Sequence, residues 1–172
     1  PMIQQLAQKK GKGLVLAPTR ELALQINEAL GKLLLTFRMR SAVIIGGESM
    51  HRQVQALRNG PRVLIATPGR LLDHLEQRNT RLAAVAILVL DEADRMLDMG
   101  FAPQIDQILR LIPKDRQTML FSATMPASIV KIAAAHMRLP VRTEIAPTGT
   151  TAERVSQELF VVSKEKKAGL LG

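Results

Sequence analysis

The sequence predicts an α/β domain with a parallel sheet and helices on both faces. Short apolar runs alternate with helix-like segments along the chain, an order typical of parallel sheets. Several of these runs are apolar at every position, as expected when both faces of a sheet are covered. With 172 residues, the chain is long enough for one domain with a sizeable core.

The expected elements follow from these runs and from the turn residues between them. Strands are predicted at Leu14–Ala17, Ala42–Ile45, Val63–Ala66, Ile87–Leu90, Thr118–Phe121 and Val141–Ile145. Helices are predicted at Glu21–Leu35, Met50–Asn59, Arg70–Gln77, Ile105–Leu111 and Ala127–His136. The first domain is therefore expected over residues 1–145. Residues 146–154 are expected to form a linker, and residues 155–172 to begin a second domain with a strand and a helix start.

Charge and composition restrict the partners. The chain carries 24 Lys and Arg against 15 acidic residues, a net charge of +9, which indicates a polyanion and most often nucleic acid. It has four Phe and neither Trp nor Tyr, so contacts to the nucleic-acid backbone are favoured over base stacking. The absence of cysteine excludes disulfides and thiolate metal sites and suits a cytoplasmic protein. No membrane association is expected.

The residues that directly follow the predicted strands carry the candidate chemistry, because open α/β sheets bind ligands beyond the carboxyl ends of their strands. In order, they are Pro18–Ala23 (PTRELA), Gly46 and Gly47, Thr67–Arg70 (TPGR), Asp91–Asp94 (DEAD) and Ser122–Thr124 (SAT). In PTRELA and TPGR, a helix start and an Arg together favour an anion such as phosphate, and ordinary helix capping is the alternative. For the Gly pair, the alternatives are close approach to a ligand and a plain turn.

The acidic segment after the predicted strand Ile87–Leu90 has the form of a magnesium and water site. Asp91 is placed to hold Mg²⁺ through water, and Glu92 to orient an attacking water molecule. The alternative is that these acids only favour the dipole of a following helix. His51, His74 and His136 lie far apart in the sequence, so solvated or core positions are expected for them instead of a metal site.

Taken in this order and with these gaps, the segments resemble the first RecA-like domain of DEAD-box ATP-dependent RNA helicases. The surrounding LVLDEADRMLDMGF and QTMLFSAT are similar to the bacterial RhlE-type subgroup. The resemblance implies a RecA-like fold of the P-loop NTPase type. It also implies ATP and Mg²⁺ as cofactors, and RNA as a partner whose short duplexes are opened locally, with ATP hydrolysis stimulated by RNA.

The resemblance also implies residue roles. Asp91 would hold Mg²⁺, Glu92 would act on the water that attacks the γ-phosphate, and Asp94 would couple nucleotide state to RNA binding through Ser122 and Thr124. The RNA backbone would be contacted without sequence specificity by Thr19, Arg20, Gly46, Gly47, Thr67, Pro68, Gly69 and Arg70.

One element of this family is missing from the sequence. A Walker A loop has the pattern G-x-x-x-x-G-K-[ST], and neither Gly11-Lys12 nor Gly31-Lys32 fits it. Because Pro1–Leu6 resembles the end of the helix that follows this loop in the family, we expect a truncated chain that lacks the Walker A strand and almost all of the second domain. Such a chain would bind ATP weakly or not at all.

The missing strand is expected to affect the stability and association of the sheet. Loss of an interior strand would leave two neighbouring strands with unpaired edges, which favours low stability, strand complementation from another molecule or self-association.

The alternative function is a nucleotide-independent module that binds the RNA backbone. A metal-dependent nuclease or phosphatase built on Asp91, Glu92 and Asp94 lacks any further carboxylate or His cluster near them in the sequence.

Overall fold

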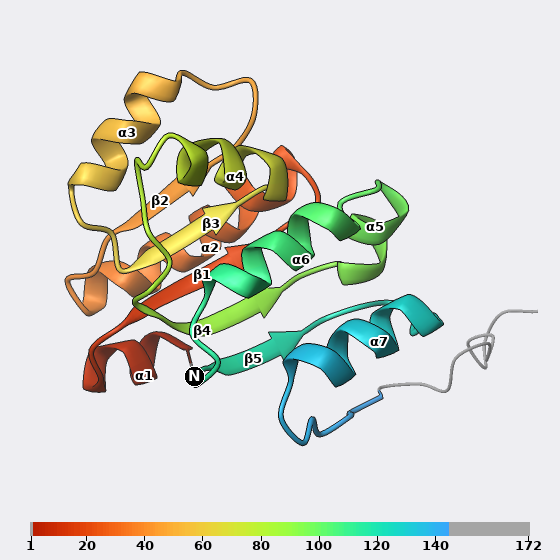
Figure 1. Cartoon of the computed structure of the whole chain (residues 1–172). Helices are drawn as coiled ribbons and strands as arrows, with labels where there is room; N and C mark the ends of the chain where they lie inside the picture. The colour runs from red at the N-terminus through yellow and green to blue at the C-terminus, as the bar shows by residue number, and fades with distance from the viewer. Residues whose placement is uncertain (1, 145–172) are drawn as a thin grey trace, which may run out of the picture. The chain divides into compact units, whose positions relative to one another are not determined.

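A computed structural model describes residues 2–144 and contains a five-stranded sheet (Figure 1). The strands are β1 (Lys12–Leu16), β2 (Ser41–Ile44), β3 (Val63–Ala66), β4 (Val85–Leu90) and β5 (Gln117–Leu120). Their spatial order is β2-β3-β1-β4-β5, and every neighbouring pair is parallel. The predicted parallel α/β sheet is therefore confirmed. The expected gap with two unpaired neighbouring edges was wrong for residues 2–144, because the five strands form one continuous sheet in which β4 pairs directly with β5.

The helices connect these strands, as parallel pairing requires. They are α1 (Met2–Gln8), α2 (Arg20–Thr36), α3 (Met50–Arg58), α4 (Pro68–Glu76), α5 (Ala93–Asp98), α6 (Ala102–Leu111) and α7 (Ala127–His136). The helices predicted at these places are confirmed, with boundary shifts of a few residues. Helices α1 and α5 were not predicted, because at 7 and 6 residues they are too short to give a helical period.

Two apolar clusters lie on opposite faces of the sheet. On one face, α1 and α2 pack on Val15, Ile65 and Ile87. On the other face, helices from α3 to α7 pack on Leu14, Leu64 and other strand residues. Both faces of the inner strands are thus covered, which explains why β3 is apolar and buried at all its positions.

The two ends of the strand order are less covered than its centre. Strand β5 pairs only with β4, and Gln117 is exposed while the remaining three residues of β5 are half-buried. The strand predicted at Val141–Ile145 was wrong over residues 141–144, which have no regular structure, and Ile145 lies outside the described residues. Val141 is 91% exposed. A strand is stabilised by pairing with a neighbour, and no ladder among residues 2–144 includes this segment.

The chain divides into two units, Pro1–Pro140 and Val141–Gly172. The expected linker (146–154) and the expected start of a second domain (155–172) lie outside the described residues, so these boundaries stay predictions. Within residues 2–144, no helix is both long and apolar enough to cross a membrane.

Candidate functional site

All five predicted segments lie at one edge of the sheet, because every strand is parallel and each segment follows the carboxyl end of its strand. In Figure 1 the five strand arrows point the same way, toward this edge. Since β1 is central, the edge has two parts. We call Pro18–Arg20, Ile45–Glu48 and Thr67–Arg70, which follow β1, β2 and β3, the loop cluster. We call Asp91–Asp94 and Ser122–Thr124, which follow β4 and β5, the carboxylate cluster.

Helix starts account for part of the loop cluster. The Thr19 hydroxyl accepts a hydrogen bond from the Leu22 backbone N–H at 3.2 Å and caps α2. Thr67 precedes α4, but its hydroxyl makes no capping bond, and Pro68 is the first residue of that helix. Both Thr67 and Pro68 are buried, so α4 begins inside the protein, and within Thr67–Arg70 only Gly69 and Arg70 are partly accessible.

The two residues of the Gly pair differ in backbone conformation and in the space around them. Gly47 has φ +71°, in the left-handed region that favours glycine, whereas Gly46 does not. A Cβ on Gly47 would also lie 1.8 Å from a guanidinium nitrogen of Arg20, which contacts the loop there and forms an ion pair with Glu48 at 3.6 Å. A Cβ on Gly46 would meet no atom within 4 Å. Close approach is therefore a property of Gly47.

Arg70 holds the Gly pair from both sides. Its Nε donates to the Ile45 carbonyl oxygen at 3.1 Å, and its Nη2 donates to the Glu48 carbonyl oxygen at 2.6 Å. Its Nη1 faces Asp73 at 3.6 Å, and the side chain is only 16% exposed. The Arg that the sequence places for a phosphate thus bonds mainly to backbone carbonyl groups in this structure.

Two buried polar residues extend this set, and sequence reasoning did not connect either with the site. Gln53 of α3 donates to the Ile45 carbonyl oxygen at 2.7 Å, and its Oε1 lies 2.9 Å from Nε2 of His74. His74 is fully buried on α4, so of the two positions expected for the histidines, solvated or core, it has the core one. Burial lowers the pKa of His74, and the nearby Arg70 charge lowers it further, against a smaller opposing effect of Asp73. The sequence contains one signal for the burial of Gln53. Gln53 lies four residues before Leu57, so both side chains fall on the buried face of α3.

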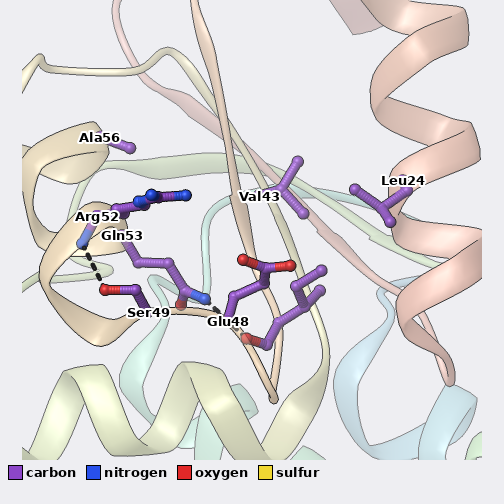
Figure 2. Close-up of a pocket in the computed structure, with 8 residues that line it drawn as sticks. Leu24, Val43, Glu48, Ser49, Arg52, Gln53 and Ala56 are labelled. Carbon is purple, nitrogen blue, oxygen red and sulfur yellow. Dashed lines mark hydrogen bonds between the residues drawn. The ribbon is translucent and has the colours of Figure 1, made fainter.

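A shallow hollow lies next to this network, between α2, β2 and α3 (Figure 2). Leu24 and Val43 lie on one side of it, and Arg52, Gln53 and Ala56 lie on the other. Its volume of about 220 Å³ is below the ~300 Å³ at which ligand pockets usually begin. The hollow is therefore too small for a nucleotide.

The carboxylate cluster contains a residue with a strained backbone, Glu92. Glu92 has φ 48° and ψ 52°, a left-handed conformation that costs a non-glycine residue about 1 kcal/mol. Its side chain forms an ion pair with Arg95 at 3.0 Å. Asp91 accepts a bond from the Glu92 backbone N–H at 3.1 Å. Burial raises the pKa of Asp91, the Glu92 N–H opposes this, and the Glu92 charge raises it further.

Asp94 joins the ends of β4 and β5. One of its oxygens accepts from both the backbone N–H and the hydroxyl of Thr124, at 2.9 and 2.7 Å. Its own N–H donates to the Ser122 hydroxyl at 3.2 Å. Burial acts to raise the pKa of Asp94, but the bonds from Thr124, Ser122 and the Arg95 backbone together lower it. Relative to the unfolded chain, the fold therefore favours the charged form of Asp94 and disfavours that of Asp91.

The carboxylates present are compatible with a Mg²⁺ ion that keeps most of its waters. No group of three or more potential metal ligands occurs among residues 2–144. Asp91 supplies carboxylate oxygens, and Mg²⁺ binds through one or two carboxylates while keeping several waters. A bound cation would also offset the raised pKa of Asp91.

Comparison with known proteins gives consistent results. The family described as DEAD/DEAH box helicase matches residues 1–132. The chain is 44% identical over 156 residues to the DEAD-box ATP-dependent RNA helicase CshA of Bacillus licheniformis, covering 91% of this chain and 32% of the relative. It is 46% identical over 166 residues to the ATP-dependent rRNA helicase RRP3 of Debaryomyces hansenii, covering 95% and 35%.

Comparison of the fold with solved structures agrees with these sequence matches. The crystal structure of a DEAD box protein from Methanococcus jannaschii matches with a TM-score of 0.71 and 38% identity, covering 76% of this chain and 36% of that chain. The chain thus spans about a third of the length of these relatives. The RhlE-type subgroup is not among the names of these relatives and stays a prediction.

Proposed function

This chain belongs to the DEAD/DEAH box helicase family, and we propose that it acts as the first RecA-like domain of an ATP-dependent RNA helicase. The observation that carries the proposal is the meeting of the five predicted segments at one edge of a parallel sheet, with Asp94 bonded to both Ser122 and Thr124. In this arrangement, one part of the edge binds RNA and the other acts on a nucleotide.

The loop cluster is the proposed RNA-binding part. Its members are Thr19, Arg20, Gly46, Gly47, Thr67, Pro68, Gly69 and Arg70. Arg20 is partly exposed beside Gly47, so its guanidinium is placed to bind phosphate once its ion pair with Glu48 opens. Buried Thr67 and Pro68 contribute by starting α4. The net charge of +9 supports binding of an RNA backbone regardless of base sequence.

The carboxylate cluster is the proposed nucleotide part. Asp91 would hold the waters of Mg²⁺, and Glu92 would orient the water that attacks the γ-phosphate. Bound ATP and Mg²⁺ would supply the phosphoryl group and the charge that stabilises its transfer. Asp94 would transmit the state of this region to β5 through Thr124 and Ser122, since its bonds join the ends of two strands.

A nucleotide-independent RNA-binding module is the second candidate. The residues given contain no G-x-x-x-x-G-K-[ST] loop, so these residues alone supply the loop cluster without a phosphate cradle. For the chain as given, we therefore propose RNA binding with weak or no ATP binding and little hydrolysis. A cytoplasmic location fits the lack of cysteine.

RNA binding is tested by fluorescence anisotropy with a labelled single-stranded oligouridine, over about 50 to 200 mM salt. We expect affinity to fall steeply with salt and to weaken in Arg20→Gln. Arg110→Gln is the matched control, because Arg110 is also exposed and ion-paired with an acid, at 2.7 Å from Asp106, but lies on α6. Equal losses in both variants would indicate nonspecific charge, and no binding at the lowest salt would contradict the proposal.

The nucleotide part is tested by phosphate release with ATP and Mg²⁺, with and without RNA. Release well above the rate of a Glu92→Gln variant would contradict the weak hydrolysis proposed for this chain. Self-association, or pairing with a strand from another molecule, would use the open edge of β5, which like β2 lies at an end of the strand order. Light scattering at rising concentration tests this, and a monomer at all concentrations with a high unfolding midpoint would argue against it.

A further inference from the structure

The buried pair of His74 and Gln53 is the feature that the proposed function leaves unexplained. Their exposed fractions are 0% and 5%, and with Thr67 they are the buried polar residues of the described chain. A buried polar group without a partner costs about 1 to 3 kcal/mol, so such groups persist when they are fully hydrogen-bonded. Here each side chain has a partner on both of its ends.

The partners determine how the pair is oriented. The Ile45 carbonyl can only accept, so the Gln53 amide nitrogen must face it and Oε1 must face His74. Nε2 of His74 must then carry a proton and donate to Oε1, at 2.9 Å. Nδ1 is left as an acceptor for the Asn79 amide, at 3.3 Å. A neutral imidazole satisfies every one of these bonds, which agrees with the complete burial of His74.

The pair ends on the carbonyl oxygen that precedes the Gly pair. Ile45 O accepts from Gln53 at 2.7 Å and from Arg70 at 3.1 Å, while Arg70 also holds Glu48 O on the far side at 2.6 Å. One of the dashed bonds in Figure 2 is the one from Gln53. Gly46 and Gly47 are thus held at both ends by side chains of α3 and α4.

We propose that His74 and Gln53 are positioning residues that keep the Gly46-Gly47 loop in the shape that binds the sugar-phosphate backbone of single-stranded RNA. The inference rests on the proposed RNA binding and deepens it. Glycines have the largest conformational freedom to lose, so a loop ordered in advance lowers the cost of ordering on binding. His74 and Gln53 would act through Ile45 and touch no RNA, since both are buried.

The test compares His74→Phe with His74→Gln and with His136→Phe. Phe keeps the ring but removes both hydrogen bonds of His74, while Gln keeps an N–H donor for Gln53. His136→Phe is the matched control, because His136 is a partly buried His of α7, which follows β5. We expect RNA affinity to fall on the order of fivefold in His74→Phe, to recover at least in part in His74→Gln, and to stay unchanged in His136→Phe.

NMR separates positioning from mere stability. We expect backbone order parameters of Gly46 and Gly47 near about 0.85 in the wild-type chain and below about 0.6 in His74→Phe. The wild-type His74 ring should show the neutral tautomer protonated on Nε2. Unchanged affinity and order parameters in a folded His74→Phe would overturn the inference. If that variant does not fold, the same measurements on the wild-type chain test the inference. Low order parameters at Gly46 and Gly47, or a His74 ring protonated on Nδ1, would overturn the inference.

The outcomes also distinguish the two proposals. If the wild-type chain binds no RNA, the proposed function fails, whereas the order parameters and the tautomer still report whether the pair holds the loop. If the wild-type chain binds RNA but the His74 variants match it, the positioning role alone fails.

Discussion

The loop cluster and the carboxylate cluster share one edge of one sheet but are held in different ways. In the loop cluster, Arg70 and Gln53 bond to backbone carbonyl groups from largely buried positions. In the carboxylate cluster, the bonds of Thr124 and Arg95 to acidic side chains are exposed to solvent. Of these bonds to the backbone, the one from Gln53 is buried, while those from Arg70 come from a side chain that is 16% exposed. Exposed bonds between side chains exchange more easily with water. The first cluster is built as a preformed surface, and the second as one that can rearrange.

The sheet beneath them differs in the same sense. Strands β1 and β3 are interior and almost entirely buried, while β5 lies at the end of the strand order with no residue fully buried. Local stability follows buried apolar contact, so the Ser122–Thr124 end of the site is expected to open at lower free energy than the Gly46-Gly47 end. This contrast leads to the predictions below.

The largest expected effect is that of removing Arg70 of the loop cluster, compared with removing Arg95, which pairs with Glu92 of the carboxylate cluster. Arg70→Met should lower the free energy of unfolding by about 2 kcal/mol, because two charge-assisted bonds to carbonyl oxygens are lost. Arg95→Met should change it by less than about 0.5 kcal/mol, because its ion pair with Glu92 is exposed. Urea unfolding of both variants measures the difference. Equal losses would show that the two clusters are held equally.

A smaller effect is expected within the loop cluster. Gly47→Ala should cost about 1 to 2 kcal/mol, since Ala disfavours φ +71° and its Cβ would displace the Arg20 guanidinium. Gly46→Ala is the control and should change stability by less than about 0.5 kcal/mol, because a Cβ there meets open space. RNA affinity should fall more in the first variant. A Gly46→Ala variant as unstable as Gly47→Ala would contradict the distinction drawn between these glycines.

The contrast also shows what the sequence could predict. Short apolar runs predicted all five strands of the described sheet, and several of these runs are apolar throughout, because burial on both faces favours an apolar residue at every position of a strand such as β3. The segments at the strand ends were predicted because parallel strands place them together. The Val141–Ile145 strand was predicted wrongly over its described residues, because an apolar run does not reveal whether a neighbour is there to pair with it.

The internal support of the site could not be predicted in the same way. Whether Arg70 faces a ligand or the Ile45 and Glu48 carbonyl groups depends on how α4 packs beside the Gly pair, which is a tertiary fact. The bond between Gln53 and His74 joins residues 21 positions apart, with no local signal. The left-handed conformation of Glu92 likewise has no signature, since glutamate rarely adopts it.

Opposite signs are expected for the two aspartates of the carboxylate cluster. Asp94→Asn should lower stability by up to about 1 kcal/mol, because it weakens the bonds from Thr124 to a carboxylate that the fold favours. Asp91→Asn should leave stability unchanged or raise it by less than about 1 kcal/mol, because the fold disfavours the charge of Asp91. Thermal unfolding at neutral pH measures both. A loss of stability in both variants would show that Asp91 is held as firmly as Asp94.

The smallest expected effect is a loss of stability between about pH 7 and pH 5. His74 and His136 both have a pKa below the ordinary 6.5, so the unfolded chain takes up protons in this range before the folded chain does. Their contribution is complete above the ordinary value and is lost as pH falls toward the folded values. The contribution of Asp94 to stability is complete above the ordinary pKa of 3.8 and is lost only at lower pH, since its folded pKa lies below that value.

The two histidines should not contribute equally to this loss. His74 is fully buried beside Arg70, with Asp73 as the opposing acid, whereas His136 is 23% exposed and lies 3.8 Å from Asp106, with Arg110 and Arg116 nearby. His74→Phe should therefore flatten the dependence of the urea midpoint on pH more than His136→Phe does. If His136→Phe flattened the pH dependence of the urea midpoint more than His74→Phe does, the histidine with the more strongly lowered pKa would be the one on α7, which follows β5. That result would reverse the contrast between the two clusters.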